Sequence, residues 1–122
     1  YYFARNFNAD SGLIASMMVM AEVGRSGAAL SEVRRPFERY AASGEINTQV
    51  VDAHAVIERI SEQYADRPQD RLDGLTVDCG SWWFNLRPSN TEPLLRLNLE
   101  ADDRTTCDDG VSTLLSQITS AD

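Results

Sequence analysis

The sequence predicts an α+β fold in which residues 41–122 form one mostly antiparallel sheet with two helices on one face. Several short segments alternate apolar with polar residues, which is typical of strands that bury one side. Two other segments space their apolar residues by three and four, which predicts amphipathic helices. In chain order the elements are strand, helix, four strands and helix, or β-α-β4-α. Residues 1–40 are predicted to be helical, and the domain boundary is expected near residues 40–44.

The predicted helical segment at the start of the chain is strongly apolar. Asp10 or Ser11 can cap a helix over residues 12–23, which has no clear polar face. Because about 12 residues cannot cross a hydrocarbon core that needs roughly 20, we expect its large side chains to be buried against other protein: Leu13, Ile14, Met17, Met18 and Met20. The alternative is a methionine-rich binding surface. Ser31 opens a second short helix, which Pro36 interrupts.

The sheet domain is expected to begin after a linker at residues 41–44. Residues 45–50 alternate and predict the first strand, and Asp52 precedes a helix. The apolar stripe of that helix is formed by Ala53, Val56, Ile57, Ile60 and Tyr64. Residues 67–72 predict a second, short strand, and the Asp-Gly pair at 73–74 marks a tight turn after it.

Three strands and a helix complete the predicted domain. The first of these strands covers residues 75–79 and ends at a Gly-Ser turn. Alternation then predicts a strand from Trp82 onward, with Trp82 in the core and Trp83 half exposed, and a last strand over residues 94–100. Thr105 or Thr106 is expected to cap the final helix. Its apolar face is formed by Cys107, Val111, Leu114, Leu115 and Ile118.

Charge and composition narrow the possible functions. The 11 basic residues face 19 acidic ones, and a net charge of -8 disfavours a partner such as nucleic acid or an anionic membrane. All basic residues are arginine, which excludes mechanisms that need a lysine Schiff base or a P-loop lysine. Cys79 and Cys107 show no metal-ligand spacing, and we expect reduced thiols in a cytoplasmic protein.

The segment that connects the last two strands has the composition of an anion site. Residues 87–93 carry a guanidinium at Arg87, two hydroxyls at Ser89 and Thr91, and an amide at Asn90, between two prolines. Backbone N–H groups in such a turn can form a concave anion nest, and the arginine fork can meet two phosphate oxygens. The sequence therefore predicts phosphate binding. The alternative is a polar turn in which Arg87 pairs with a carboxylate such as Glu92.

Other candidate sites have simpler explanations. His54 is the single histidine and begins a predicted helix, so we expect a surface or helix-end residue rather than a catalyst. Acidic pairs at 102–103 and 108–109 could suggest a cation site. They flank a helix start, where carboxylates are favoured by the partial positive charge, so we expect a solvated helix terminus.

The string RPSNTEP, preceded by the Asp-Gly turn and WWFNL and followed by LLRLNLEA, resembles the last domain of the α-D-phosphohexomutases, the phosphomannomutase/phosphoglucomutase family. The resemblance covers residues 43–120, and residues 1–12 are similar to a segment of the family's third domain. It implies a TBP-like C-terminal domain preceded by helices from the end of an incomplete α/β domain, with a boundary between residues 40 and 41. The expected partners are therefore a hexose phosphate substrate and the upstream domains of the same protein.

The resemblance also implies a site and a reaction. Arg87, Ser89, Asn90 and Thr91 match the positions that hold the non-reacting phosphate of the substrate. Family members interconvert hexose 6-phosphate and hexose 1-phosphate through a phosphoserine, a bisphosphorylated intermediate and Mg²⁺. The 122 residues contain no phosphoserine loop and no magnesium loop, so we expect an inactive C-terminal fragment with no catalytic or metal-ligating residue. Within the family, Asn90 favours the phosphomannomutase/phosphoglucomutase subgroup over the phosphoglucosamine mutases, which usually have glycine at this position. The alternative is a stand-alone module that binds a phosphorylated metabolite or mediates subunit contacts.

Overall fold

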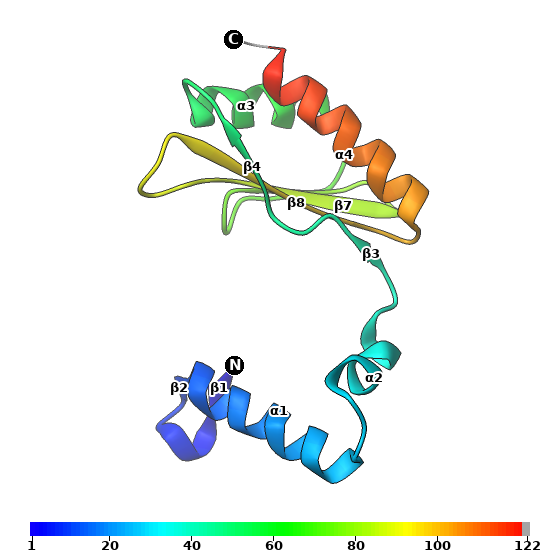
Figure 1. The fold of residues 1–122 in the computed structure, drawn as a ribbon. Coiled ribbons are helices and arrows are strands. Elements are labelled where there is room, and N and C mark those ends of the chain that lie inside the picture. The colour runs from blue at the N-terminus through cyan, green and yellow to red at the C-terminus, as the bar shows by residue number, and fades with distance from the viewer. Residues whose placement is uncertain (121–122) are drawn as a thin grey trace. The chain divides into compact units, whose positions relative to one another are not determined.

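The computed structural model describes residues 1–120, which divide into two units, Tyr1–Glu38 and the part of the chain from Arg39 onward. In the first unit, β1 (Tyr2–Phe3) pairs antiparallel with β2 (Ala9–Asp10) around the 3-10 turn η1 (Ala4–Asn6). The sequence predicted helices throughout residues 1–40, so this strand pair is a difference from the prediction. The helices of the unit follow it (Figure 1).

Helix α1 (Gly12–Ser26) is three residues longer than predicted. Ser11 caps it by accepting a hydrogen bond of 3.2 Å from the Ile14 N–H. The helix continues to Gly27, which has a φ of 65° and donates its N–H to the Val23 carbonyl at 3.1 Å. Gly24 therefore does not end the helix, because the left-handed position that terminates it lies at the next glycine.

The second helix of this unit also differs slightly from the prediction. Helix α2 (Leu30–Arg34) begins one residue before Ser31, and the Glu32 carboxylate accepts the Ala29 N–H at 3.2 Å. Pro36 lies in the 3-10 turn η2 (Arg35–Phe37), so the α-helix ends before it.

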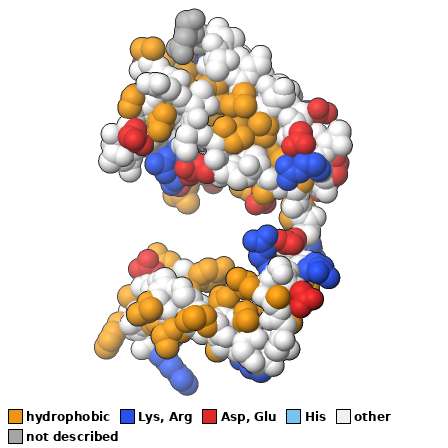
Figure 2. Space-filling view, viewed as in Figure 1, with side chains coloured by type: hydrophobic (Ala, Val, Ile, Leu, Met, Phe, Trp, Pro, Cys, Tyr) orange, Lys and Arg blue, Asp and Glu red, His pale blue; other side chains and the backbone are white. Residues whose placement is uncertain are grey.

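The apolar side chains of α1 are exposed in the described part of the chain. Leu13, Met17, Met18 and Met20 are each more than half exposed, whereas Ile14 is partly buried, and Figure 2 shows hydrophobic side chains gathered over this unit. Their burial against other protein stays a prediction. No single described helix is long and apolar enough to span a membrane. The bent pair of α1 with residues 30–37, at an angle of 103°, reaches that length and composition only when taken together.

The second unit contains one antiparallel sheet with two helices on one face, which confirms the predicted fold class (Figure 1). The order of its strands is β3-β8-β7-β6-β5, and β4 also pairs with β8. The elements are β3 (Ala41–Ala42), β4 (Ile46–Gln49), α3 (Ala53–Gln63), β5 (Gln69–Asp70), β6 (Leu75–Asp78), β7 (Trp82–Pro88), β8 (Leu94–Ala101) and α4 (Arg104–Thr119).

The prediction that residues 41–44 form a linker was wrong. Ala41 and Ala42 form β3 and pair with the end of β8, and Ser43 exchanges two hydrogen bonds with Leu99, of 2.9 and 3.0 Å. Between β3 and β4 one extra residue opposes β8, and Gly44 has a φ of 68° there. The glycine thus belongs to a bulge in a paired edge. The small side chains carry no alternation that could have indicated this pairing.

Two other boundaries differ from the prediction. The strand expected over residues 67–72 is limited to β5, which leaves a four-residue connection, 71–74, before β6. Helix α4 is capped by Asp103 instead of Thr105 or Thr106: its carboxylate accepts the Thr106 N–H at 2.9 Å. This bond lowers the pKa of the Asp103 carboxyl. Thr106 lies inside the first turn, where its hydroxyl donates to the other carboxylate oxygen of Asp103 at 2.7 Å.

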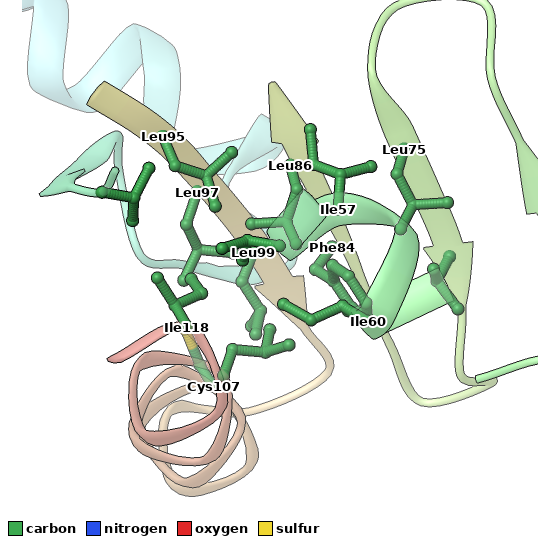
Figure 3. Packing of buried hydrophobic residues seen from close by; sticks show 14 of the residues in the cluster. Ile57, Ile60, Leu75, Phe84, Leu86, Leu95, Leu97, Leu99, Cys107 and Ile118 are labelled. Atoms are coloured by element: carbon green, nitrogen blue, oxygen red, sulfur yellow. The ribbon is translucent and has the colours of Figure 1, made fainter. Parts of the chain in front are cut away.

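The core lies between the sheet and the two helices (Figure 3). Phe84 is fully buried and packs against Tyr64, with ring centroids 5.2 Å apart, and against Trp82 at 5.7 Å. Trp83 points to the other side and is 37% exposed, so the predicted orientations of both tryptophans are confirmed. The core residues labelled in Figure 3 are Ile57, Ile60, Leu75, Phe84, Leu86, Leu95, Leu97, Leu99, Cys107 and Ile118.

Candidate functional site

The loop between β7 and β8 is held by backbone hydrogen bonds at its base. The Ser89 N–H donates to the Leu94 carbonyl at 2.8 Å, and the Leu94 N–H donates to the Glu92 carbonyl at 2.7 Å. The Val50 N–H donates to the Pro93 carbonyl at 3.3 Å, which ties the loop to the residue that follows β4. These bonds and the two prolines restrict the backbone of the loop before any ligand binds.

The tip of this loop presents hydrogen-bond donors that have no acceptor within residues 1–120. Within residues 1–120, the amide N–H groups of Asn90, Thr91 and Glu92 make no hydrogen bond. The side chains of Asn90 and Thr91 make none either. Unpaired N–H groups in a restrained turn are suited to an anion, since they keep their orientation and are already accessible to solvent.

A concave surface that encloses a volume of about 590 Å³ is lined by the four residues predicted for phosphate binding, among others. The start of α3, the connection before β6, the end of β7 with its loop, and β8 contribute to it. The lining residues are His54, Ile57, Glu58, Arg71, Asp73, Gly74, Arg87, Pro88, Ser89, Asn90, Thr91 and Arg96. Arg87, Ser89, Asn90 and Thr91 are therefore brought together on one surface.

Arg87 pairs with a carboxylate, as the alternative interpretation of the loop expected, but the partner is Asp73 and not Glu92. An Nη1–H of Arg87 donates to Oδ2 of Asp73 at 3.0 Å. The pair joins residues 14 positions apart, so local sequence gave no sign of it. Gly74 has a φ of 75°, and a Cβ at this position would lie 2.2 Å from the Leu86 carbonyl oxygen. The turn can approach β7 this closely because residue 74 has no side chain.

Arg96 is the second arginine of the site and was missed from the sequence. It lies directly opposite Arg87 in the β7–β8 register and donates an Nη2–H to the Ser89 hydroxyl at 3.4 Å. Its Nη1 lies 3.6 Å from a carboxylate oxygen of Glu45, and its buried Nε has no partner among the described residues. Like charges opposite each other destabilise a sheet. An anion bound between the two guanidinium groups would offset that repulsion.

Arg71 is the third arginine and was also missed. Both of its terminal nitrogens pair with Glu58, one at 3.0 Å, and Nη2 also donates to the Ser61 hydroxyl at 2.7 Å. The hydrogen bond to Arg71 lowers the pKa of the Glu58 carboxyl, which therefore stays ionised. The lining residues thus carry three arginines and two carboxylates, Glu58 and Asp73, and the carboxylate of Glu45 lies beside Arg96.

The sequence signal for Arg96 was present in the alternation of β8. Leu95, Leu97 and Leu99 are buried, so the residues between them point to the opposite face of the sheet. Pairing β8 with β7 would have placed Arg96 near Arg87. Arg71 had no comparable signal, because it follows a two-residue strand and reaches the site through a connection.

The remaining candidates have simple positions. His54 is exposed in the first turn of α3, as expected, and it also lines the concave surface. The Asp103 carboxylate caps α4, and Asp108 pairs with Arg104 at 3.2 Å. In residues 1–120, no three His, Cys, Asp or Glu side chains lie close enough together to hold a metal ion between them.

The comparisons with known proteins identify the family. The family model described as "Phosphoglucomutase/phosphomannomutase, C-terminal domain" matches residues 45–112, which include every residue that lines the concave surface. This chain belongs to the phosphoglucomutase/phosphomannomutase family. The fold and the RPSNTEP loop described above are thus those of a C-terminal domain of this family.

Individual relatives extend the match to both units. The chain is 41% identical over all of its 122 residues to a phosphomannomutase of Methanocaldococcus jannaschii, of which it covers 27%. It is 45% identical over 103 residues to phosphohexose mutases of Xanthomonas campestris, a match that covers 82% of the chain and 23% of the relative. A phosphomannomutase of Salmonella typhimurium is 40% identical over 104 residues, 83% of the chain and 23% of that protein. The chain therefore spans about a quarter of the length of these relatives.

Proposed function

We propose that the second unit binds the phosphate group of a hexose phosphate on its concave surface. One observation carries the proposal: two arginines, Arg87 and Arg96, lie directly opposite each other beside a restrained loop with unused N–H donors. This arrangement brings guanidinium groups, each with a carboxylate neighbour, and directed donors together on one surface of an acidic protein. A phosphate dianion complements both features.

Each residue of the site has a proposed role. The planar guanidinium of Arg87 can meet two phosphate oxygens at once. Ser89 and Thr91 supply hydroxyl groups, and Asn90 supplies its side-chain amide, while the free backbone N–H groups of the loop supply further donors. Arg96 adds a second positive charge next to Ser89. None of these groups distinguishes the hydroxyl pattern of the sugar, so the site would accept either phosphate-bearing end of a hexose.

The proposed reaction is that of a phosphohexomutase, the interconversion of hexose 6-phosphate and hexose 1-phosphate. In this reaction the concave surface holds the phosphate that does not react, and this binding energy orients the other end of the sugar. The first unit is proposed to belong to the preceding domain of the same enzyme. The phosphoserine and Mg²⁺ chemistry is assigned to no residue of this chain. We therefore expect the 122 residues to bind substrate without converting it.

Titration with mannose 6-phosphate, followed by ³¹P NMR, tests the binding proposal. Replacing Arg87 by alanine removes at least one charge-assisted hydrogen bond, and one such bond is worth about 1.5–3 kcal/mol, so Kd should rise at least roughly 10- to 150-fold. Arg67→Ala is the matched control. It removes the same charge from a residue that pairs with Asp66 outside the concave surface.

The outcomes of the titration are distinct. We expect Arg67→Ala to bind like the wild type, within the small effect of a distant charge. Equal affinity of wild type and Arg87→Ala would contradict the proposed site, and so would an equal loss in Arg67→Ala. Conversion of mannose 1-phosphate to mannose 6-phosphate by the 122-residue chain would contradict the assignment of catalysis to residues outside it.

A further inference from the structure

We infer that Asp73 is a positioning residue, which orients the Arg87 guanidinium for the phosphate and does not contact the phosphate itself. The inference rests on the proposed function, since it concerns how that site is organised. Asp73 accepts one hydrogen bond from Arg87, and the other four of its five N–H groups make no hydrogen bond within residues 1–120. One edge of the guanidinium is therefore held while the remaining donors stay available.

Asp73 is itself held by the strand that carries Arg87. The side-chain amide of Asn85, two residues before Arg87 on β7, donates to the Asp73 carbonyl at 2.8 Å and to the Thr76 hydroxyl at 3.0 Å. Gly74 allows the turn to lie against the Leu86 carbonyl. The backbone of Asp73 is thus fixed relative to that of Arg87 from two sides, and from this position its 70% exposed carboxylate reaches the guanidinium as an acceptor.

The charge of Asp73 is unfavourable for an anion site, and two effects of its pairing with Arg87 oppose this cost. A carboxylate that lines the concave surface repels phosphate. In exchange, it offsets the repulsion between Arg87 and Arg96 and restricts a side chain that is only 39% exposed. An arginine that is already ordered loses less rotamer freedom when the ligand binds.

The test separates hydrogen bonding from charge by comparing two neutral variants. Asp73→Asn keeps an oxygen that accepts from Arg87, whereas Asp73→Ala has no acceptor. Because both lack the charge, repulsion of the phosphate cancels in their comparison. With inorganic phosphate as the probe, measured by ³¹P NMR, we expect Asp73→Ala to bind about two- to tenfold more weakly than Asp73→Asn, the effect of ordering one long side chain. Equal or tighter binding by Asp73→Ala would overturn the inference.

A second comparison covers the case in which Asp73→Ala does not fold. Asp73→Glu keeps the charge and moves the acceptor by one methylene, so it should bind phosphate more weakly than the wild type; equal binding would overturn the inference. Asp78 supplies the matched control. Its carboxylate accepts the Gly80 N–H at 2.8 Å instead of an arginine, and it lies outside the concave surface, so Asp78→Asn and Asp78→Ala should bind equally.

The inference and the proposed function fail in different ways. Wild type and Arg87→Ala that bind phosphate equally, or a wild type that does not bind it, would refute the proposed function and the role of Asp73 with it. A large loss in Arg87→Ala, together with equal affinities of Asp73→Ala and Asp73→Asn, would leave the phosphate site intact and refute the positioning role alone.

Discussion

Gly74→Ala tests whether the close approach of the 71–74 turn to β7 holds the second unit together. The added Cβ would lie 2.2 Å from the Leu86 carbonyl oxygen and 3.0 Å from the Arg87 Cα. Both of these are backbone atoms of a central strand, so neither can move aside as a flexible side chain could. The turn must therefore shift away from β7, or the strand must bend.

The expected loss has two parts. A φ of 75° places alanine in the left-handed region, which costs about 1–2 kcal/mol. Overpacking against rigid atoms costs about 1–3 kcal/mol more. We expect the free energy of unfolding to fall by about 2–5 kcal/mol, which moves a urea midpoint by roughly 2 M for a small domain.

Urea unfolding followed by tryptophan fluorescence measures this loss. Both tryptophans, Trp82 and Trp83, lie in the second unit, so the signal follows that unit. Gly80→Ala is the matched control: its φ is 91°, but nothing lies within 4 Å of the Cβ it would gain. It should lose only the conformational part, about 1–2 kcal/mol. If Gly74→Ala lost no more than Gly80→Ala, the contact with Leu86 would have no energetic role.

Three further predictions concern the core, a helix cap and a buried thiol. Leu97→Ala removes a fully buried side chain from the middle of β8 and should cost about 2–5 kcal/mol in the same urea experiment; a loss below about 1 kcal/mol would contradict the packing. Asp103→Ala should lower the Tm at pH 7. Because the Thr106 N–H lowers the Asp103 pKa, the stability it provides is present above the usual value of 3.8 and lost as the pH falls through the folded-state pKa, so the Tm of the two proteins should converge in acid. Burial raises the Cys107 pKa above 9.0, so the stability gained by keeping the thiol neutral is present below pH 9.0 and lost as the pH rises. A thiol reagent at pH 8 should therefore modify Cys107 no faster than the chain unfolds, and rapid modification of native protein would argue against its burial.

The strands and helices of the second unit could be predicted because their signal is local. Alternation along β7 and β8 follows from the two-residue period of a strand, and one buried face was enough to orient Trp82 and Trp83 correctly. The stripe on α3 has the same origin in helical spacing. Errors occurred where local pattern is weak. The alanines of β3 carry no alternation, and the cap of α4 required a choice among neighbouring polar residues that all favour caps.

Some features of the candidate site could likewise be predicted from the sequence, and others could not. The composition of the loop, with Arg87, Ser89, Asn90 and Thr91 within five positions, can be read directly from the sequence. The tertiary structure was needed to establish Asp73 as the partner of Arg87. It also decided that Arg96 lies opposite Arg87.

The physical reason is that pairing between distant residues depends on strand register and on a close approach permitted by Gly74. Neither can be derived from the spacing of residues along the chain. A loop motif can therefore predict the kind of ligand, whereas the charges that balance and orient the site become visible only when the strands are paired.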